Sequence, residues 1–543
     1  MTEDSTVGDS AAAQSHQSWA PMAIIALGQA QISLNISALP ISIGGIVADF
    51  ETAPTTVGTA IVAHSLAVAA FTMVSARLGQ KFGSLRVFRI STLGLLAAMV
   101  LMTASRSVAT LIAAQSIAGL AVAGMTPTLV VLIAHNYSGR QQARALGFLG
   151  AVKAIAAVAA LFVAGVIGTS FGWRYAFGLV IPFSVLTLVV SARLQPVPAL
   201  PSAKIDLVGA GLAAVAIALI SLGVNNLTNW GGLLATPLAP FGVLGLSPAL
   251  VMVVAGVLGV QLFVVWVGRL ERQRLMPLIA SRILGSSQER AAVLAMMSIV
   301  MLSNVLTFLV PLYIQIVQGQ TSLRTAVAMI PYQLSVFAAA ILVVNLHGRM
   351  APREIARYAF ALVAIAMVLL AVVVNNEWSN LLVVAGLVLV GLGQGALVTL
   401  LFNVMVTASP RTLAGDVGAL RGTISGLAAG VGIALASALV VGILAINIDR
   451  SLVAHPTIPP ELIQQVDLDR ADFVSNEKLR EVMARTTATA DQIDEAVRIN
   501  SEARLRALKL SFLLLAGIAL VVIVPAGRLP GYARRPAASD AKT

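Results

Sequence analysis

Three ionisable side chains, His64, Lys153 and Arg421, lie inside long apolar stretches of this sequence. Such groups are costly to place in a bilayer and are therefore candidates for function. His64 is a candidate proton carrier because imidazole titrates near neutral pH, and an interhelical hydrogen bond is its alternative role. Lys153 either snorkels to the membrane interface or faces an interior cavity. Arg421 is expected to anchor its helix at the interface or to pair with Asp416.

Acidic side chains are missing from the middle of the same stretches. Those nearest to them lie near the ends: Asp49, Glu51, Asp206, Glu289 and Asp416. A cavity with cations and no carboxylate favours an anionic or neutral amphiphile over a cation. The sequence therefore predicts that whatever binds here is not attracted by negative charge.

The elements that hold these groups follow from composition. The chain is 58% hydrophobic and 11% charged. In soluble domains roughly half of the residues are apolar and about a quarter are charged. A bilayer-spanning helix needs about 20 apolar residues. Fourteen stretches of that length centre near Leu34, Val68, Ala97, Val122, Ala157, Val185, Val215, Gly256, Leu302, Phe337, Ile365, Leu389, Leu427 and Ile518. The sequence predicts an all-α polytopic membrane protein.

Basic residues predict the orientation. Lys and Arg fill the gaps after every even-numbered stretch and the C-terminal tail, whereas the short gaps on the other side hold only Arg106, Arg174 and Arg324. The positive-inside rule then places both termini in the cytoplasm. We expect the membrane to be the cell inner membrane. The basic segment 447–509 on the predicted outer side is long enough to cross regardless of charge.

Proline residues after the sixth stretch mark a seam between two six-helix bundles, with stretches seven and eight as an inserted pair. Within segment 447–509, Phe473–Met483 and Ile493–Leu508 are predicted to be amphipathic helices. The predicted parts are an N-terminal cytoplasmic tail 1–19, a first bundle 20–195, an inserted pair 206–270, a second bundle 289–525 that includes 447–509, and a cytoplasmic tail 526–543.

Other site classes find no support. The sequence has no cysteine and five scattered histidines, so we expect no metal site. Zinc-protease, phosphate-loop and dinucleotide motifs are absent, so we expect no cofactor, no catalytic residue and no enzymatic activity. The net charge of +12 is spread over short loops without a basic, aromatic face, so no nucleic-acid partner is expected.

Several strings resemble the major facilitator superfamily, and specifically its fourteen-spanner drug:proton antiporter family. These strings are Ser37-Ala38-Leu39-Pro40, 76–83 (ARLGQKFG), 171–177 (FGWRYAF), 204–209 (KIDLVG), Glu271-Arg272 with Pro277-Leu278, and 414–432. The resemblance spans nearly the whole chain, and the strings occur in the family's order. Several charged signature positions differ: Gln31 and Gln80 stand where the family usually has Asp, and Gln115 where it has Arg.

The resemblance implies alternating access of two bundles around a central cavity. Candidate substrate-binding residues are Gln31, Ser33, Gln115 and Lys153 in the first bundle and Asn304 and Gln394 in the second. His64 is the candidate proton-coupling residue. The loop residues Arg77, Gln80, Lys81, Arg86 and Arg89 are expected to hold a cytoplasmic gate shut by contacting helix ends.

We therefore expect a monomeric exporter of an amphiphilic small molecule, in contact with membrane lipid, with protons as a candidate coupling ion. One alternative is an uncoupled facilitator or exchanger of a lipid-like or organic anion. A second is a non-transporting membrane sensor or assembly partner that acts through 447–509. Four glycines spaced by four, Gly418, Gly422, Gly426 and Gly430, predict a close helix contact in either case.

Overall fold

A computed structural model describes residues 18–200, 205–237, 239–242, 244–275, 277–278, 285–346, 350–375, 378–408, 414–454, 476–485 and 488–531. The predicted tails therefore fall largely outside the described residues. So do residues 455–475, which include the start of the predicted helix Phe473–Met483. Among the described residues, all regular secondary structure is helical, and one isolated bridge joins Leu234 to Leu246. Within it, fourteen helices are long and apolar enough to cross a membrane, which confirms the predicted all-α polytopic fold.

The first bundle contains α1 (Ala20–Ile41), the short α2 (Ile43–Phe50), α3 (Pro54–Phe82), α4 (Ser84–Thr103), α5 (Val108–Asn136), α6 (Gly139–Ser170), α7 (Trp173–Gly178) and α8 (Val180–Ser191). Local signals set the ends of these helices. Ser107 and Thr110 form a capping box at the start of α5. Gly83 joins α3 to α4 at a φ of 92°, a conformation that glycine adopts without steric cost.

The inserted pair consists of α9 (Leu207–Asn225) and α11 (Pro248–Arg272), joined through α10 (Leu227–Trp230). Asp206 caps α9 by accepting a hydrogen bond from the Gly209 backbone and also accepts from the Trp266 indole of α11. Gly256 and Gly259 let α11 lie close against Ala216 of α9. Because α9 contacts both α3 and α16, the pair attaches to the seam between the bundles.

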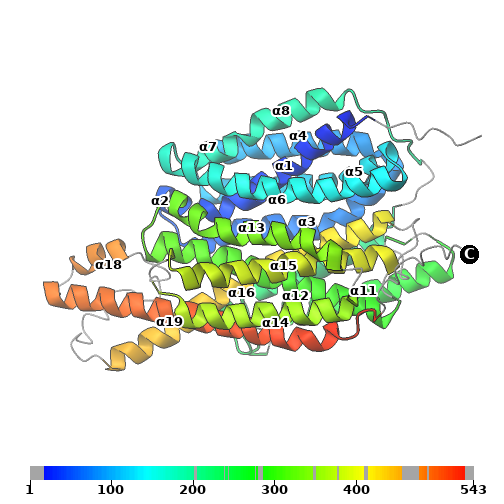
Figure 1. The fold of residues 1–543 in the computed structure, drawn as a ribbon. Coiled ribbons are helices and arrows are strands. Elements are labelled where there is room, and N and C mark those ends of the chain that lie inside the picture. Colours follow the sequence, from blue (N-terminus) through cyan, green and yellow to red (C-terminus); the bar gives the residue numbers. More distant parts are fainter. Residues whose placement is uncertain are drawn as a thin grey trace, which may run out of the picture.

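The second bundle contains α12 (Ser287–Leu312), the π-helical turn η2 (Tyr313–Val317), α13 (Ser322–Leu346), α14 (Pro352–Val373), α15 (Leu381–Ala408), α16 (Ala414–Ala454) and α19 (Ala490–Ala526), with the short α18 (Asn476–Met483). The stretch predicted as a separate helix, Ile493–Leu508, is instead the first part of α19, which runs on without a break into the spanning segment. Figure 1 shows α18 and this part of α19 projecting beyond one end of the bundle.

The two bundles meet along α3 with α16 and along α6 with α13 (Figure 1). A Cβ on Gly422 would press on Thr72 of α3. A Cβ on Gly426 would press on the backbone of Ser65 and Ala69 in the same helix. The bundles are therefore in close contact at these glycines.

The two ends of the bundle differ in charge. Where α1 begins and α3 ends, the chain carries Arg77, Arg89, Arg193, Arg272 and Arg353, and we call this end the Arg-rich face. The other end, called the opposite face, holds the α6–α7 turn, the start of α13 and α18. This polarity matches the alternation of basic loops in the sequence.

Candidate functional site

Lys153 lies on the interior side of α6. Its side chain is exposed, as are those of Ile155 (58%) and Phe162 (54%) on the same helix. Lys153 and Phe162 are separated by about two and a half helical turns, so they point in opposite directions. Because the apolar Ile155 and Phe162 mark the lipid side, Lys153 is accessible from the interior of the bundle rather than from lipid.

Arg421 projects from α16 of the other bundle and is half-buried. Its guanidinium lies over the ring of Phe402 on α15, with 4.1 Å between Cζ and the ring centroid, so the aromatic face holds the cation in place. Lys153 and Arg421 are close enough to repel each other. We call these two residues the cation pair. One member comes from each bundle.

Acidic side chains do not approach the middle of the described spans. Asp206, Glu289 and Glu354 lie in the N-terminal caps or first turns of their helices, and Asp416 is engaged by Arg77 at the start of α16. Two like charges of this kind repel when the space between them is empty and attract an anion placed there. The arrangement can therefore bind a carboxylate, sulfonate or phosphate group between the two bundles.

Arg77 fastens the Arg-rich face. Its guanidinium forms an ion pair of 3.1 Å with Asp416, and the two side chains are 12% and 9% exposed. It also donates to the carbonyls of Pro277 and Leu278, after the inserted pair, and to Oε1 of Gln80. We call Arg77, Asp416, Pro277 and Leu278 the Arg77 latch. It joins the first bundle, the second bundle and the loop after α11.

A second contact fastens the opposite face. The side-chain amide of Gln315 in η2 accepts from the backbone N–H of Gly44 at 2.8 Å and donates to the Pro40 carbonyl at 3.2 Å. Nearby, the backbone of Leu323 donates to Thr169 of α6. The bundles are thus tied at both faces around the cation pair. Sequence reasoning missed Gln315, whose only signal is a polar residue in an apolar run.

The comparisons with known proteins agree with this architecture. A family model described as Major Facilitator Superfamily matches residues 25–433. The chain belongs to this superfamily. It is 26% identical to the probable actinorhodin transporter of Streptomyces coelicolor over 78% of this chain and 73% of that protein. It is 27% identical to the cephamycin export protein CmcT of Amycolatopsis lactamdurans over 73% and 78% of the two chains.

Among solved structures, the human organic anion transporter MFSD10 (TETRAN) is similar at a TM-score of 0.54 with 13% sequence identity, covering 93% of this chain and 99% of that one. At this identity the likeness concerns the fold alone. The chain is thus a multi-pass membrane transporter of the major facilitator superfamily and not an enzyme.

The remaining loop residues of this superfamily member have separate surroundings. Arg89 donates to the hydroxyl and carbonyl of Ser191, the last residue of α8, so it does contact a helix end. Lys81 lies over the adjacent Phe82 ring at 5.5 Å from its centroid. Arg86 is exposed. Of the five predicted gating residues, the ion pair between bundles involves Arg77, with Gln80 supporting its guanidinium.

A double-mutant cycle at the Arg77 latch is expected to show strong coupling. Arg77→Ala should destabilise the protein by about 3 kcal/mol, because it leaves the mostly buried Asp416 carboxylate without this partner. The double variant with Asp416→Ala should lose clearly less than the sum of the two single losses. Thermal unfolding of the four purified proteins measures both effects. Additive losses would show that the pair contributes no coupling.

Three predicted substrate-binding residues and the predicted proton carrier lie buried within the first bundle. Gln31 donates to Thr187 at 2.6 Å and accepts from Ser184 of α8 at 2.7 Å. Gln115 exchanges hydrogen bonds with Asn35. Ser33 is 4% exposed. These placements favour interhelical hydrogen bonding over contact with a ligand.

His64 is packed between α3 and α5. Its ring lies near the backbone of Gln115, and among the described residues neither ring nitrogen makes a well-formed hydrogen bond. Gly119 makes this proximity feasible, since a Cβ there would come within 2.4 Å of the His64 carbonyl oxygen. Of the titratable groups predicted at depth, the structure brings Lys153 and Arg421 together and leaves His64 apart from them.

The variant Gln31→Met distinguishes a structural role of Gln31, joining α1 to α8, from a role in substrate binding. If Gln31 only joins α1 to α8, the variant should lose about 1 kcal/mol of stability, the usual worth of a hydrogen bond between membrane helices. Its ranking of transported compounds should stay unchanged. Unfolding temperature and a competition assay with several amphiphiles measure the two quantities. A changed ranking at unchanged stability would return Gln31 to the binding site.

The two predicted residues of the second bundle are half-buried. Gln394 of α15 accepts a hydrogen bond from the Tyr332 hydroxyl of α13. Asn304 of α12 donates to the Val300 carbonyl one turn earlier and lies beside Gly432 of α16. Tyr332, which the sequence did not single out, is buried. The second bundle therefore offers amide groups, whereas the charged contact comes from Arg421.

Proposed function

We propose that this transporter exports an amphiphilic organic anion from the cytoplasm across a cell inner membrane by alternating access, with the Arg-rich face cytoplasmic. The observation that carries the proposal is the cation pair: Lys153 and Arg421 come from different bundles and lie within electrostatic range of each other, and Lys153 is exposed on the side of α6 opposite its lipid-facing residues. The basic loops support the orientation, because Lys and Arg are retained on the cytoplasmic side.

The cation pair links binding to conformation. Without an anion, repulsion between Lys153 and Arg421 opposes the approach of the two bundles around the cavity. A bound anion removes that repulsion and favours the state in which both cations contact it. Differential affinity for two arrangements is what a ligand needs to shift a conformational equilibrium. The substrate's own charge would thus favour closure of the cavity around it.

Export as the direction rests on relatives. CmcT of Amycolatopsis lactamdurans is named a cephamycin export protein, and the chain aligns with most of its length. The apolar part of the substrate is supported by the aromatic ring of Phe402, which lies beneath Arg421. The proposal requires no proton on His64, which lies between α3 and α5. Transport would then be driven by the substrate gradient, the membrane potential or exchange.

Proteoliposomes test the proposal with carboxyfluorescein as an anionic probe and ethidium as a cationic probe of similar size. The native protein should move carboxyfluorescein and leave ethidium at the background rate of empty liposomes. Lys153→Ala should reduce the anion's rate about tenfold, equivalent to about 1.4 kcal/mol of lost charge attraction. Preference for ethidium, or an anion rate unchanged by Lys153→Ala, would overturn the proposal.

The same preparation tests the source of energy. Imposing a pH difference at zero membrane potential should leave the carboxyfluorescein rate unchanged in the native protein and in His64→Gln. A rate that rises with the pH difference in the native protein and not in His64→Gln would assign proton coupling to His64.

A further inference from the structure

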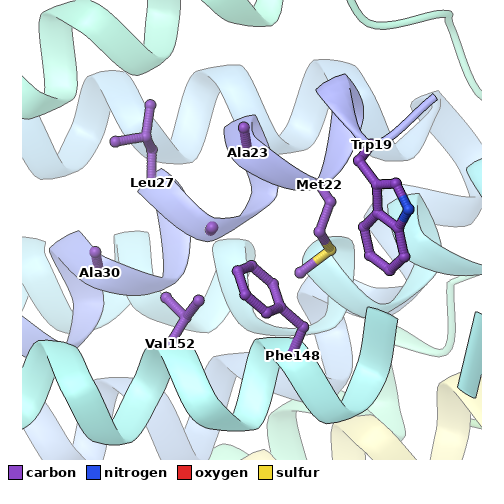
Figure 2. A pocket seen from close by; sticks show the side chains of 8 residues that line it. Trp19, Met22, Ala23, Leu27, Ala30, Phe148 and Val152 are labelled. Carbon is purple, nitrogen blue, oxygen red and sulfur yellow. The ribbon is translucent and has the colours of Figure 1, made fainter. Parts of the chain in front are cut away.

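A wholly apolar groove runs between α1 and α6 on the outside of the first bundle. Its volume is about 850 Å³, and its walls are Trp19, Met22, Ala23, Ala26, Leu27 and Ala30 on α1 with Phe148 and Val152 on α6. Figure 2 shows Leu27, Ala23 and Met22 along α1 and Val152 and Phe148 across from them. Three of the α1 residues that line it are alanines, Ala23, Ala26 and Ala30, and Phe148 is the large aromatic residue on the α6 side.

The groove opens toward lipid and not toward the cation pair. Phe148 is 48% exposed and shares a face of α6 with Ile155 and Phe162, the residues that mark the lipid side. Lys153 points away from this face. A molecule in the groove therefore enters sideways from the bilayer, and the occupant is distinct from one that binds Lys153.

The groove's length matches one leaflet. From Trp19 to Ala30, α1 rises about 16 Å at 1.5 Å per residue. Half of a hydrocarbon core about 30 Å thick is about 15 Å. An acyl chain that begins at the level of Trp19 would therefore end near Ala30, close to the middle of the membrane.

The end of the groove at the Arg-rich face suits a headgroup. Trp19 is 45% exposed and stacks beside Tyr137 at 5.5 Å between ring centroids. The Tyr137 hydroxyl accepts from the Met22 backbone and donates to the Ser18 carbonyl, which fixes this corner. Arg144 lies one turn before Phe148 on the same helix face, is exposed and forms no ion pair with a described residue. Aromatic and basic side chains at this depth are typical of the interface with lipid headgroups.

We propose that this groove binds an anionic phospholipid of the leaflet at the Arg-rich face, with an acyl chain along α1 and the phosphate beside Arg144. Charge selects the occupant: a zwitterionic lipid would gain the same apolar contacts but less from the guanidinium. A tightly held lipid would stabilise the α1–α6 contact, which carries Lys153 on the far side of α6. The inference stands independently of the proposed substrate.

Trp19 is a built-in probe for this site. The purified transporter is mixed with micelles that contain brominated phosphatidylglycerol or brominated phosphatidylcholine, whose bromines quench nearby indoles. The part of the quenching that disappears in Trp19→Phe reports on the groove. We expect half-maximal quenching at an about fivefold lower fraction of the anionic lipid, the preference that one arginine near the surface provides.

Four variants decide the assignment. Arg144→Gln should remove the preference, whereas Arg272→Gln, an exposed arginine at the same face on α11, should keep it. Ala26→Phe should fill the groove and reduce Trp19 quenching by both lipids. Equal quenching by the two lipids, a preference that survives Arg144→Gln, or one that Arg272→Gln or Lys153→Ala removes would overturn the proposal.

Discussion

Reversing the charge of both members of the cation pair, Lys153→Glu with Arg421→Glu, is expected to exchange the selectivity of the transporter. Carboxyfluorescein transport should fall at least about a hundredfold, or about 2.7 kcal/mol, and ethidium transport should rise above background. The reason is the sign of the interaction: each reversal turns an attraction into a repulsion, and two charges a few ångström from the ligand act together. The two carboxylates would repel each other as the two cations do. Without a ligand, the double variant therefore keeps the same repulsion between the bundles.

The single variants make the experiment specific. Lys153→Glu alone should lose anion transport without gaining the cation, because its carboxylate would attract Arg421 and the pair would neutralise itself. Lys153→Arg should retain anion transport, since it keeps the charge on a side chain of similar length. Initial rates in proteoliposomes, normalised to reconstituted protein, measure all four proteins. A double variant that still moves the anion and ignores the cation would place the binding site elsewhere.

Much of the fold could be predicted from sequence because its signals are local. An apolar stretch of about 20 residues is enough to define a spanning helix. Basic residues occur in every second loop, which indicates the orientation of each helix in the membrane. The predicted end of the amphipathic helix at Leu508 was wrong, because a change from polar to apolar composition ends an amphipathic pattern but does not end a helix. Between Thr489 and Ala526 the sequence holds a single glycine, Gly517, and no proline before Pro525 near the end of the helix.

The site was harder to predict because polar residues in apolar helices have two outcomes. Gln31 and Lys153 are polar residues within largely apolar helices, so composition cannot tell which way either side chain faces. The fold turns Gln31 onto Thr187 and Ser184 and turns Lys153 to the interior. Asp416 shows a related problem. Arg421 follows it by five residues in the sequence, yet its ion pair is with Arg77 on another bundle.

The glycine pattern of α16 shows how far periodicity reaches. Residues spaced by four advance about 40° around a helix with 3.6 residues per turn. A row of four glycines therefore winds away from a straight contact line. Gly422 and Gly426 face α3, and Gly430 lies near both Ser65 and Ser221, whereas a Cβ on Gly418 would meet nothing within 4 Å. The predicted close contact is present, but its first member lies outside it.

Gly426→Ala is expected to stop transport by wedging the bundles apart. The added Cβ would lie 2.7 Å from the Ala69 nitrogen and 2.8 Å from the Ser65 oxygen. Both are backbone atoms of α3, so no side-chain rotation relieves the contact and the two helices must separate. Overpacking of this kind costs about 1–3 kcal/mol. Since α3 and α16 belong to different bundles, the strain falls on the surface where they move against each other, and transport should drop more than about tenfold.

Gly418→Ala is the matched control on the same helix. Its methyl group enters open space, and alanine is favoured over glycine within a helix by about 1 kcal/mol, so this variant should be as stable as the native protein or slightly more so. Carboxyfluorescein transport and unfolding temperature, measured for both variants, separate the effect of position from that of helix propensity. Equal transport by the two variants would mean that the α3–α16 seam is not a moving surface. The motion that exchanges access would then have to occur along α6 and α13.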